Sequence, residues 1–170
     1  MFGRVECVLK TAPGTGIVSS AVLQSDDLDE IDWEWLGIND LYVQTNYFGK
    51  GNTGTYNRGA THDNNGNHDE FHTYTIDWTS KQIVWQIDGQ TVRSLTPKDT
   101  EDDQYPQSPM MVKIGVWAGG DPNNAQGTIR KSICPCPLPF VPANRHEQNG
   151  PVVKRTTVLV RTPCICNPSR

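Results

Sequence analysis

The sequence lacks the features that define several large classes of protein. No stretch approaches the roughly 18 apolar residues of a transmembrane helix, and hydrophobic residues make up only 35% of the chain. Basic residues do not dominate, since 15 Lys and Arg stand against 19 Asp and Glu. The resulting net charge of −4 argues against a nucleic-acid partner, because proteins that bind nucleic acid usually carry a basic surface.

The opening residues also lack the uninterrupted apolar segment of a secretory signal. Arg4, Glu6 and Lys10 interrupt it, and they alternate with Val5, Cys7 and Leu9 as in a half-buried strand. The chain therefore begins inside a predicted strand. We expect the gene model to begin at an internal methionine.

The composition changes abruptly near residue 129. Residues 1–129 hold 8 basic and 18 acidic residues, a balance of 8 − 18 = −10, whereas 130–170 hold 7 and 1, a balance of +6. The second part carries 7 of the 12 prolines and 4 of the 5 cysteines. Proline removes a backbone donor and excludes a helix or central strand. We expect a disordered, irregular tail over 130–170, in which only 152–160 could form a strand.

Residues 1–129 read as a series of strands bounded by Gly, Pro, Asn or Asp. The expected strands cover 19–23, 31–35, 43–48, 72–78, 82–87, 91–95 and 110–118. Asp88-Gly89 predicts a type I′ hairpin turn, which needs positive φ at both positions. Residues 49–67 are expected to form a long loop, and no helix of useful length is predicted. An all-β sandwich follows.

A row of carboxylates lies in one of these strands. Glu30, Asp32 and Glu34 alternate with apolar residues, so the three acids project from one face. Their mutual repulsion raises the pKa of at least one. A pair in which one carboxyl is ionised and one protonated can serve as nucleophile and acid/base in glycoside hydrolysis. From spacing alone, a solvated acidic strand or a calcium site helped by Asp26 and Asp27 stays open.

The string DEIDWEWLG at 29–37 contains the ExDxE signature of glycoside hydrolase family 16. With APGTGIVSSAVLQSDDL before it and VQTNYFGKG after it, and with FHTYTIDW and KIGVWAGGDPNNAQGTI further on, residues 2–129 resemble the fungal Crh-type transglycosylases of that family. The resemblance implies a β-jelly-roll (concanavalin-like) sandwich, here incomplete. It makes 1–129 a partial catalytic domain and leaves 130–170 unrelated to the family.

The resemblance also implies an activity on fungal cell-wall polysaccharide. Chitin or β-glucan would be cleaved by a retaining double displacement, and the new end passed to β-glucan or water. Glu30 corresponds to the nucleophile, Glu34 to the acid/base and Asp32 to the assisting carboxylate. The protein would be extracellular and wall-bound. We expect a monomer that needs no cofactor or metal and has a polysaccharide as its partner.

Several further residues are predicted to bind sugar. In 110–118, Lys113 and Trp117 share a face, where Trp can stack on a pyranose and Lys can donate to hydroxyls. Val112, Ile114 and Val116 share the opposite, core-facing side. The resemblance adds Thr128 to the sugar-binding residues. Gln44 and Asn46 share a face with Phe48 and are also expected to line the cleft, whereas Tyr47 is expected to be structural.

The remaining Cys and His residues are not predicted to be catalytic or to bind zinc. Cys7 is predicted to be a buried apolar residue. Cys134-Pro-Cys136 and Cys164-Ile-Cys166 do not have the CxxC spacing of zinc sites. His62 and His68 are expected to be solvated in a polar loop, and His72 is kept as a candidate cleft residue.

Two alternatives to an enzyme stay open. The first is a lectin-like, non-catalytic carbohydrate-binding sandwich. The second is an inactive, truncated gene product, which the unrelated tail favours. The intact set of three acids distinguishes the enzyme from the lectin, because a pure binder has no need of matched acids beside a sugar platform.

Overall fold

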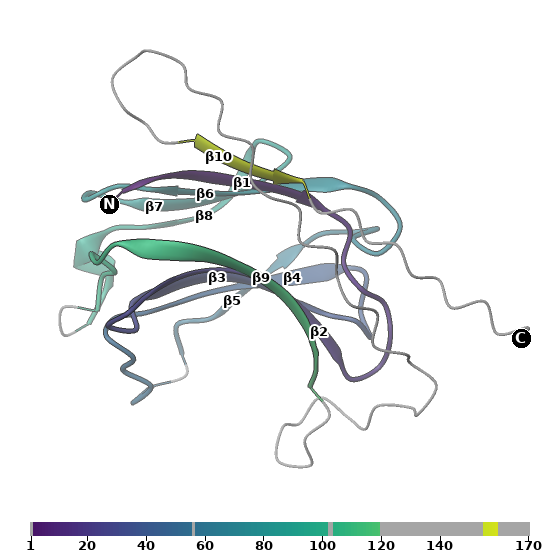
Figure 1. The fold of residues 1–170 in the computed structure, drawn as a ribbon, viewed down its shortest axis with the longest axis horizontal. Helices are drawn as coiled ribbons and strands as arrows, with labels where there is room; N and C mark the ends of the chain where they lie inside the picture. The colour runs from purple at the N-terminus through teal and green to yellow at the C-terminus, as the bar shows by residue number, and fades with distance from the viewer. Residues whose placement is uncertain (1, 56, 102–103, 120–154, 160–170) are drawn as a thin grey trace, which may run out of the picture.

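A computed structural model describes residues 2–55, 57–101, 104–119 and 155–159. Two five-stranded sheets pack face to face as a sandwich (Figure 1). The strands are β1 Gly3–Leu9, β2 Ile17–Ser25, β3 Glu30–Leu36, β4 Tyr42–Phe48, β5 Ala60–Asp63, β6 His72–Trp78, β7 Ile83–Ile87, β8 Gln90–Leu95, β9 Met110–Ala118 and β10 Arg155–Leu159. A single 3-10 turn, Pro97–Asp99, is the helical element of the described residues. The all-β prediction is confirmed.

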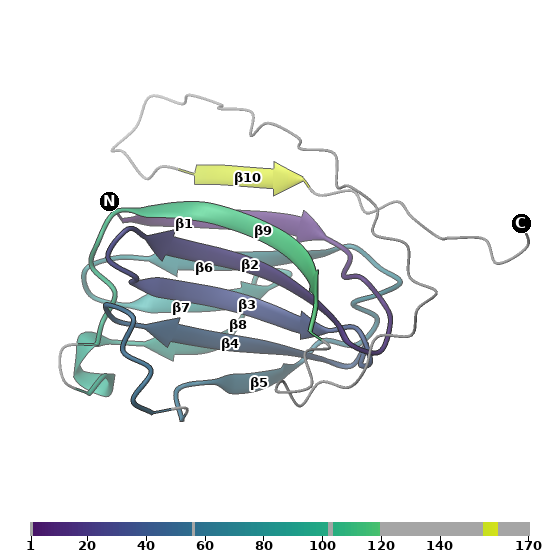
Figure 2. The same cartoon turned by 60° about the horizontal axis from the view of Figure 1, so that its bottom comes forward.

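The two sheets have the orders β10-β1-β6-β7-β8 and β5-β4-β3-β2-β9. All pairs are antiparallel except β1 with β10. Figure 2 shows the strands of the second sheet lying side by side, with β3 at its centre between β2 and β4. This sheet is arched in Figure 1, with its hollow side turned away from the first sheet.

Alternation along the strands builds the core between the sheets. Trp33 and Trp35 point inward from β3 and are about 1% exposed. They stack at 6.3 Å and meet Tyr74 of β6 edge-on. From the opposite sheet, the indole Nε1–H of Trp85 donates to the backbone oxygen of Asp32 at 3.2 Å. Central strand β3 is therefore held by aromatic packing and by a hydrogen bond from the facing sheet.

Two local predictions are confirmed by the backbone and the packing. Asp88 and Gly89 have φ values of 49° and 80°, and they connect β7 and β8 with the positive angles that the hairpin turn requires. Cys7 is 2% exposed in the core, and burial raises the pKa of its thiol to about 12.

The predicted loop over 49–67 is wrong in part, because β5 lies within it and pairs with β4. His62 is not solvated there. Its ring packs edge-on against Trp33 and its Nε2 hydrogen-bonds Thr45 Oγ1 at 2.9 Å. His72 is not a cleft residue either. It lies on the other sheet, where its Nδ1 contacts the Asp88 carboxylate at 2.7 Å.

The predicted core row of β9 is only partly covered. Ile114 packs against the core, but Val112 and Val116 are 36% and 39% exposed. The physical reason is position, because β9 is an edge strand of its sheet among the described residues. An edge strand has neighbours on one side only, so the facing sheet covers its inward side incompletely.

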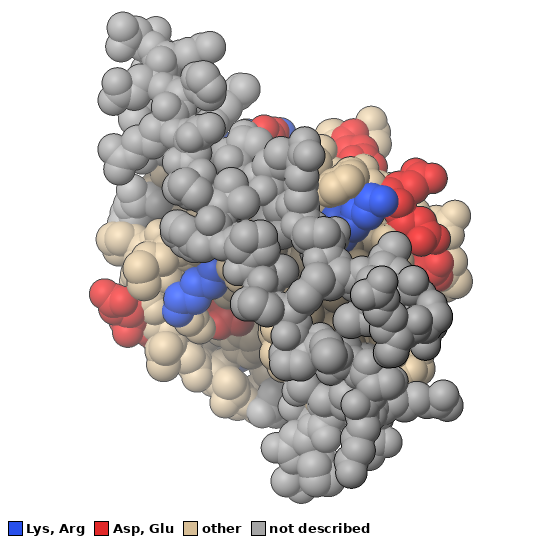
Figure 3. All heavy atoms as spheres, turned by 45° about the vertical axis from the view of Figure 1, so that its right-hand side comes forward, with Lys and Arg blue, Asp and Glu red and all other residues tan. Residues whose placement is uncertain are grey.

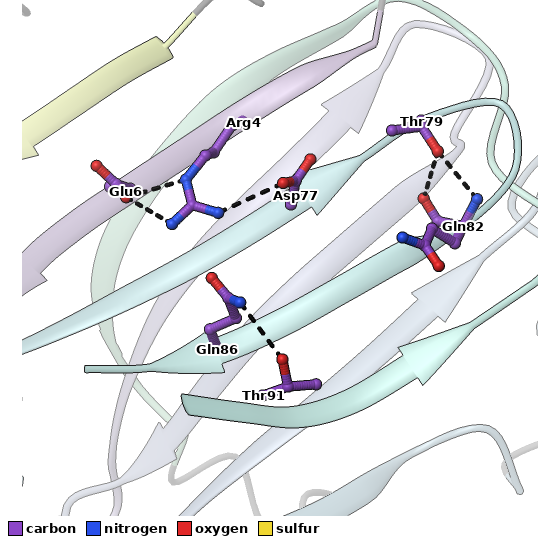
Figure 4. Close-up of polar contacts among 7 residues, drawn as sticks. All are labelled: Arg4, Glu6, Asp77, Thr79, Gln82, Gln86 and Thr91. Carbon is purple, nitrogen blue, oxygen red and sulfur yellow. Dashed lines mark hydrogen bonds and ion pairs between the residues drawn. The ribbon is translucent and has the colours of Figure 1, made fainter. Parts of the chain in front are cut away.

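The outer face of the β1-containing sheet is polar. Figure 4 shows Arg4 bonded to Glu6 and reaching Asp77 on β6, and Gln86 Nε2 donating to Thr91 Oγ1 at 3.3 Å. On the face drawn in Figure 3, Lys and Arg of the described residues lie beside acidic side chains rather than in one basic patch. No described helix has the length and apolar character needed to cross a bilayer.

Candidate active site

Strand β3 carries the three predicted acids on its outer face. Glu30 and Glu34 are half-buried, whereas Asp32 is only 3% exposed. The inward positions of the same strand hold Trp33 and Trp35, which pack against Tyr74 and so anchor β3 on the facing sheet. The prediction that all three carboxylates share one face is confirmed by the register of β3 against its neighbours.

The neighbouring strand β4 brings two further predicted residues to this row. Gln44 pairs directly with Glu34, and Asn46 pairs with Asp32. Side chains of directly paired residues on one face lie about 5 Å apart at Cβ. The Gln44 side chain is exposed and that of Asn46 half-buried. Polar side chains that can bond sugar hydroxyls therefore line one side of the acids.

Strand β9 places Lys113 and Trp117 on the same outer face, beyond β2. Val22 of β2 pairs with Asp32 on one side and with Lys113 on the other, which aligns the lysine with the acids. Trp117 is 43% exposed. Its ring is therefore not part of the core between the sheets. Thr128, the remaining predicted sugar-binding residue, lies outside the described residues.

Sequence reasoning missed Gln24 at the end of β2. It pairs with Glu30 of β3 on one side and with Met111 of β9 on the other. Its amide Nε2 donates to Glu30 Oε2 at 2.6 Å, and its Oε1 accepts from Lys113 Nζ at 2.6 Å. The predicted strand ended at residue 23. Extending its alternation by one position would have placed Gln24 on the face of the acids.

A second missed residue, Asp29, holds the beginning of the acidic strand. Asp29 is only 2% exposed. Oδ1 accepts from the Lys50 backbone N–H at 2.8 Å, and Oδ2 accepts from those of Gln107 and Ser108 at 2.7 and 2.9 Å. One buried side chain thus ties the segment after β4 and the segment before β9 to the residue that precedes Glu30.

Burial and the repulsion between like charges raise the pKa values of two of the three acids. Burial raises the pKa of the Asp32 carboxyl well above its usual range, and the negative charges of Glu34 and Glu30 raise it further. Burial, followed by repulsion from Glu30, also raises the pKa of Glu34. The row therefore keeps protons on Asp32 and Glu34 at pH values where an exposed carboxyl is ionised.

We expect Asp32→Asn to stabilise the protein at neutral pH. Folded Asp32 keeps its proton where the unfolded chain has released it, so the free energy of unfolding falls as the pH rises above about 4. This loss continues up to the raised pKa of the folded carboxyl. Asparagine does not ionise, so the difference in melting temperature between variant and wild type should grow from pH 4 to pH 8.

Asp63→Asn is a matched control, because Asp63 is exposed on edge strand β5. His62 and His68, whose pKa values are lowered by burial, change stability in the opposite direction. Both histidines are unchanged between wild type and Asp32→Asn, so that comparison removes their contribution, whereas Asp63→Asn also removes a charge that raises the pKa of His62. A difference in melting temperature between wild type and Asp32→Asn that stays constant across this pH range would contradict the buried, protonated state of Asp32.

No set of three or more His, Cys, Asp or Glu side chains suited to a metal ion occurs within the described ranges. The outer face instead presents carboxyl, amide, ammonium and indole groups. This combination suits a neutral, hydroxyl-rich ligand and acid–base chemistry at carboxyl groups.

Comparisons with known proteins identify the family of this chain. The model of glycosyl hydrolases family 16 matches residues 1–132. Crh-like protein 4 of Aspergillus fumigatus is 80% identical over 130 residues, covering 76% of this chain and 29% of that protein. Crh-like protein 4 of Botryotinia fuckeliana is 61% identical over 129 residues, covering 76% and 34%. The chain thus spans about a third of the length of these relatives.

Solved structures are similar as well. That of a Crh5 transglycosylase in complex with NAG has a TM-score of 0.73 at 52% identity, covering 76% of this chain and 56% of that one. A Bacillus licheniformis β-glucanase has a TM-score of 0.67 at 29% identity, covering 78% and 60%. Both the jelly-roll expectation and the resemblance are confirmed. With the family model matching 132 of its 170 residues, the chain belongs to glycosyl hydrolase family 16.

Proposed function

We propose that this chain carries the catalytic strand of a fungal cell-wall glycosidase and transglycosylase. It would cleave chitin or β-glucan and transfer the new end to β-glucan or to water. The observation that carries the proposal is the row on β3, in which two half-buried glutamates flank a buried aspartate on the outer face of the sheet. The similarity to Crh-like proteins and to a Crh5 transglycosylase supports transfer.

The proposed reaction has two steps. In the first, Glu30 attacks the anomeric carbon while Glu34 donates its proton to the glycosidic oxygen, giving a glycosyl-enzyme intermediate. In the second, Glu34 takes a proton from an acceptor hydroxyl, which attacks the same carbon and releases Glu30. The raised pKa of Glu34 suits a group that first gives and then takes a proton. Because Asp32 is protonated, it places no negative charge beside Glu30.

The substrate would lie across the outer face of the second sheet. Trp117 offers an exposed ring on which a pyranose can stack, while Gln44 and Asn46 offer amides to its hydroxyls. The NAG bound by the Crh5 relative supports an N-acetylglucosamine polymer as the donor. We expect the protein to act as a monomer at the cell wall.

The test is a transfer assay with a chitin oligosaccharide as donor and a fluorescent β-glucan oligosaccharide as acceptor. We expect a longer fluorescent product with the wild-type chain and none with the double variant Glu30→Gln/Glu34→Gln, which lacks both reacting groups. Binding of both sugars without any product or hydrolysis would favour the lectin-like alternative. An absence of both binding and product would favour the inactive gene product.

A further inference from the structure

We propose that Gln24 is a positioning residue that connects Lys113 to Glu30 and holds one oxygen of the nucleophile. The connection crosses three strands. Lys113 Nζ on β9 donates to Gln24 Oε1 on β2 at 2.6 Å, and Gln24 Nε2 donates to Glu30 Oε2 on β3 at 2.6 Å. The inference rests on the proposed function, since it assigns Glu30 the role of nucleophile.

The two partners leave the amide a single orientation. An ammonium group can only donate hydrogen bonds, and an ionised carboxylate can only accept them. Turning the Gln24 amide over would point its Nε2 at Lys113 and its Oε1 at Glu30, which would lose both bonds. The side chain is thereby locked by charge at each end. The positive charge of Lys113 also polarises the amide and strengthens its N–H as a donor to Glu30.

The backbone of Gln24 is also held in place, by strand pairing on both sides. Gln24 is paired on both sides, with Glu30 and with Met111. The next residue, Ser25, closes the turn from β2 to β3. Its backbone N–H donates to the Asp29 oxygen at 3.0 Å, and its Oγ accepts from the Asp29 N–H at 2.8 Å. Gln24 and Glu30 thus lie on either side of one tight turn, whose hydrogen bonds fix their relative positions.

Oε2 of Glu30 accepts a hydrogen bond from Gln24, and the Glu30 side chain is also hydrogen-bonded to the Asp32 carboxyl. A glutamate side chain has several rotamers, and a hydrogen bond to one oxygen reduces the number available before attack. Pre-orientation of the nucleophile acts on kcat, because it changes the reacting geometry rather than the binding of the sugar.

The test compares Gln24→Met with Gln86→Met. Methionine keeps the length of the side chain but cannot donate to Glu30. Gln86 also donates one hydrogen bond from a strand, but on the outer face of the other sheet (Figure 4). We expect kcat to fall between about tenfold and a hundredfold in Gln24→Met, as for a lost hydrogen bond to a charged group. KM should stay within about twofold, and Gln86→Met should match the wild type.

Gln24→Glu separates positioning from simple packing. When protonated, the introduced carboxyl can donate to Glu30 as the amide does. When ionised, it places a second negative charge against the nucleophile. We therefore expect the kcat of this variant, relative to wild type, to recover as the pH is lowered. The corresponding ratio for Gln24→Met should not depend on pH.

A third measurement does not require activity. The side-chain amide signal of Gln24 in ¹⁵N-labelled full-length chain should move in Glu30→Gln and in Lys113→Met, and stay in place in Gln86→Met. An unmoved signal, or an active wild type whose kcat survives Gln24→Met, would overturn the inference. An inactive wild type would count against the proposed function instead, and the amide signal would then decide whether Gln24 holds Glu30.

Discussion

Replacing Glu30 with alanine is expected to reduce both hydrolysis and transfer by a factor on the order of 10⁴. The nucleophile forms the covalent bond to the sugar, and removing such a group leaves only binding and the remaining acid/base chemistry. The rate should be measured on an aryl chitooligosaccharide whose leaving group absorbs light. The melting temperature of the variant should stay close to that of the wild type, because Glu30 is half-buried at the outer face.

Added azide should restore cleavage by Glu30→Ala, because the small anion can occupy the space of the lost carboxylate while Glu34 still protonates the leaving group. A single displacement inverts the anomeric carbon, so a β-linked substrate should give the α-glycosyl azide. Glu30→Gln is the matched control, since its side chain still fills the space and should block rescue. A β-azide from Glu30→Ala would contradict the assignment of Glu30 as nucleophile.

The sequence predicted the acidic strand well because one rule governs it. Side chains alternate along a strand whatever the rest of the fold does. Glu30, Asp32 and Glu34 therefore had to share a face once Trp33 and Trp35 were assigned to the core. The same rule put Lys113 and Trp117 on one face of β9. The structure adds that both faces belong to the same side of one sheet.

Other features depend on contacts that no local pattern records. The link through Gln24 exists because β9 pairs with β2, although the two residues in contact are 89 positions apart. Asp29 reads as one more acid in an acidic run, and only the arrival of the segment before β9 makes it a buried acceptor. Residues 60–63 carry too little apolar alternation to predict a strand. They form β5 because β4 offers a free edge.

The acid/base role predicts a different result for Glu34→Ala. We expect the rate on chitin oligosaccharides to fall between about 10² and 10⁴-fold, the usual contribution of a positioned acid. An aryl glycoside with a good leaving group needs little protonation, so its first step should survive. Azide should then attack the glycosyl-enzyme intermediate, and two displacements at the anomeric carbon should give the β-glycosyl azide. An α-azide from this variant would reverse the two roles.

The acid role of Glu34 also predicts how the activity of the wild type depends on pH. Glu34 must be protonated to act as the acid, so activity should fall as the pH rises through its pKa. Burial, and then the charge of Glu30, raise that pKa, so the fall should come at higher pH than for an ordinary glutamate, about 4.3. Glu34→Ala should lose this alkaline fall on the aryl glycoside.

The charge of Glu30 can be removed to test its share of this effect. In Glu30→Gln, repulsion disappears while burial remains, so the Glu34 carboxyl should release its proton at lower pH than in the wild type, yet still above an exposed glutamate. Carbon-13 NMR of the carboxyl groups measures this directly in the inactive variant. An unchanged titration would mean that burial alone sets the protonation of Glu34. The charge of Glu30 would then have no part in keeping Glu34 protonated.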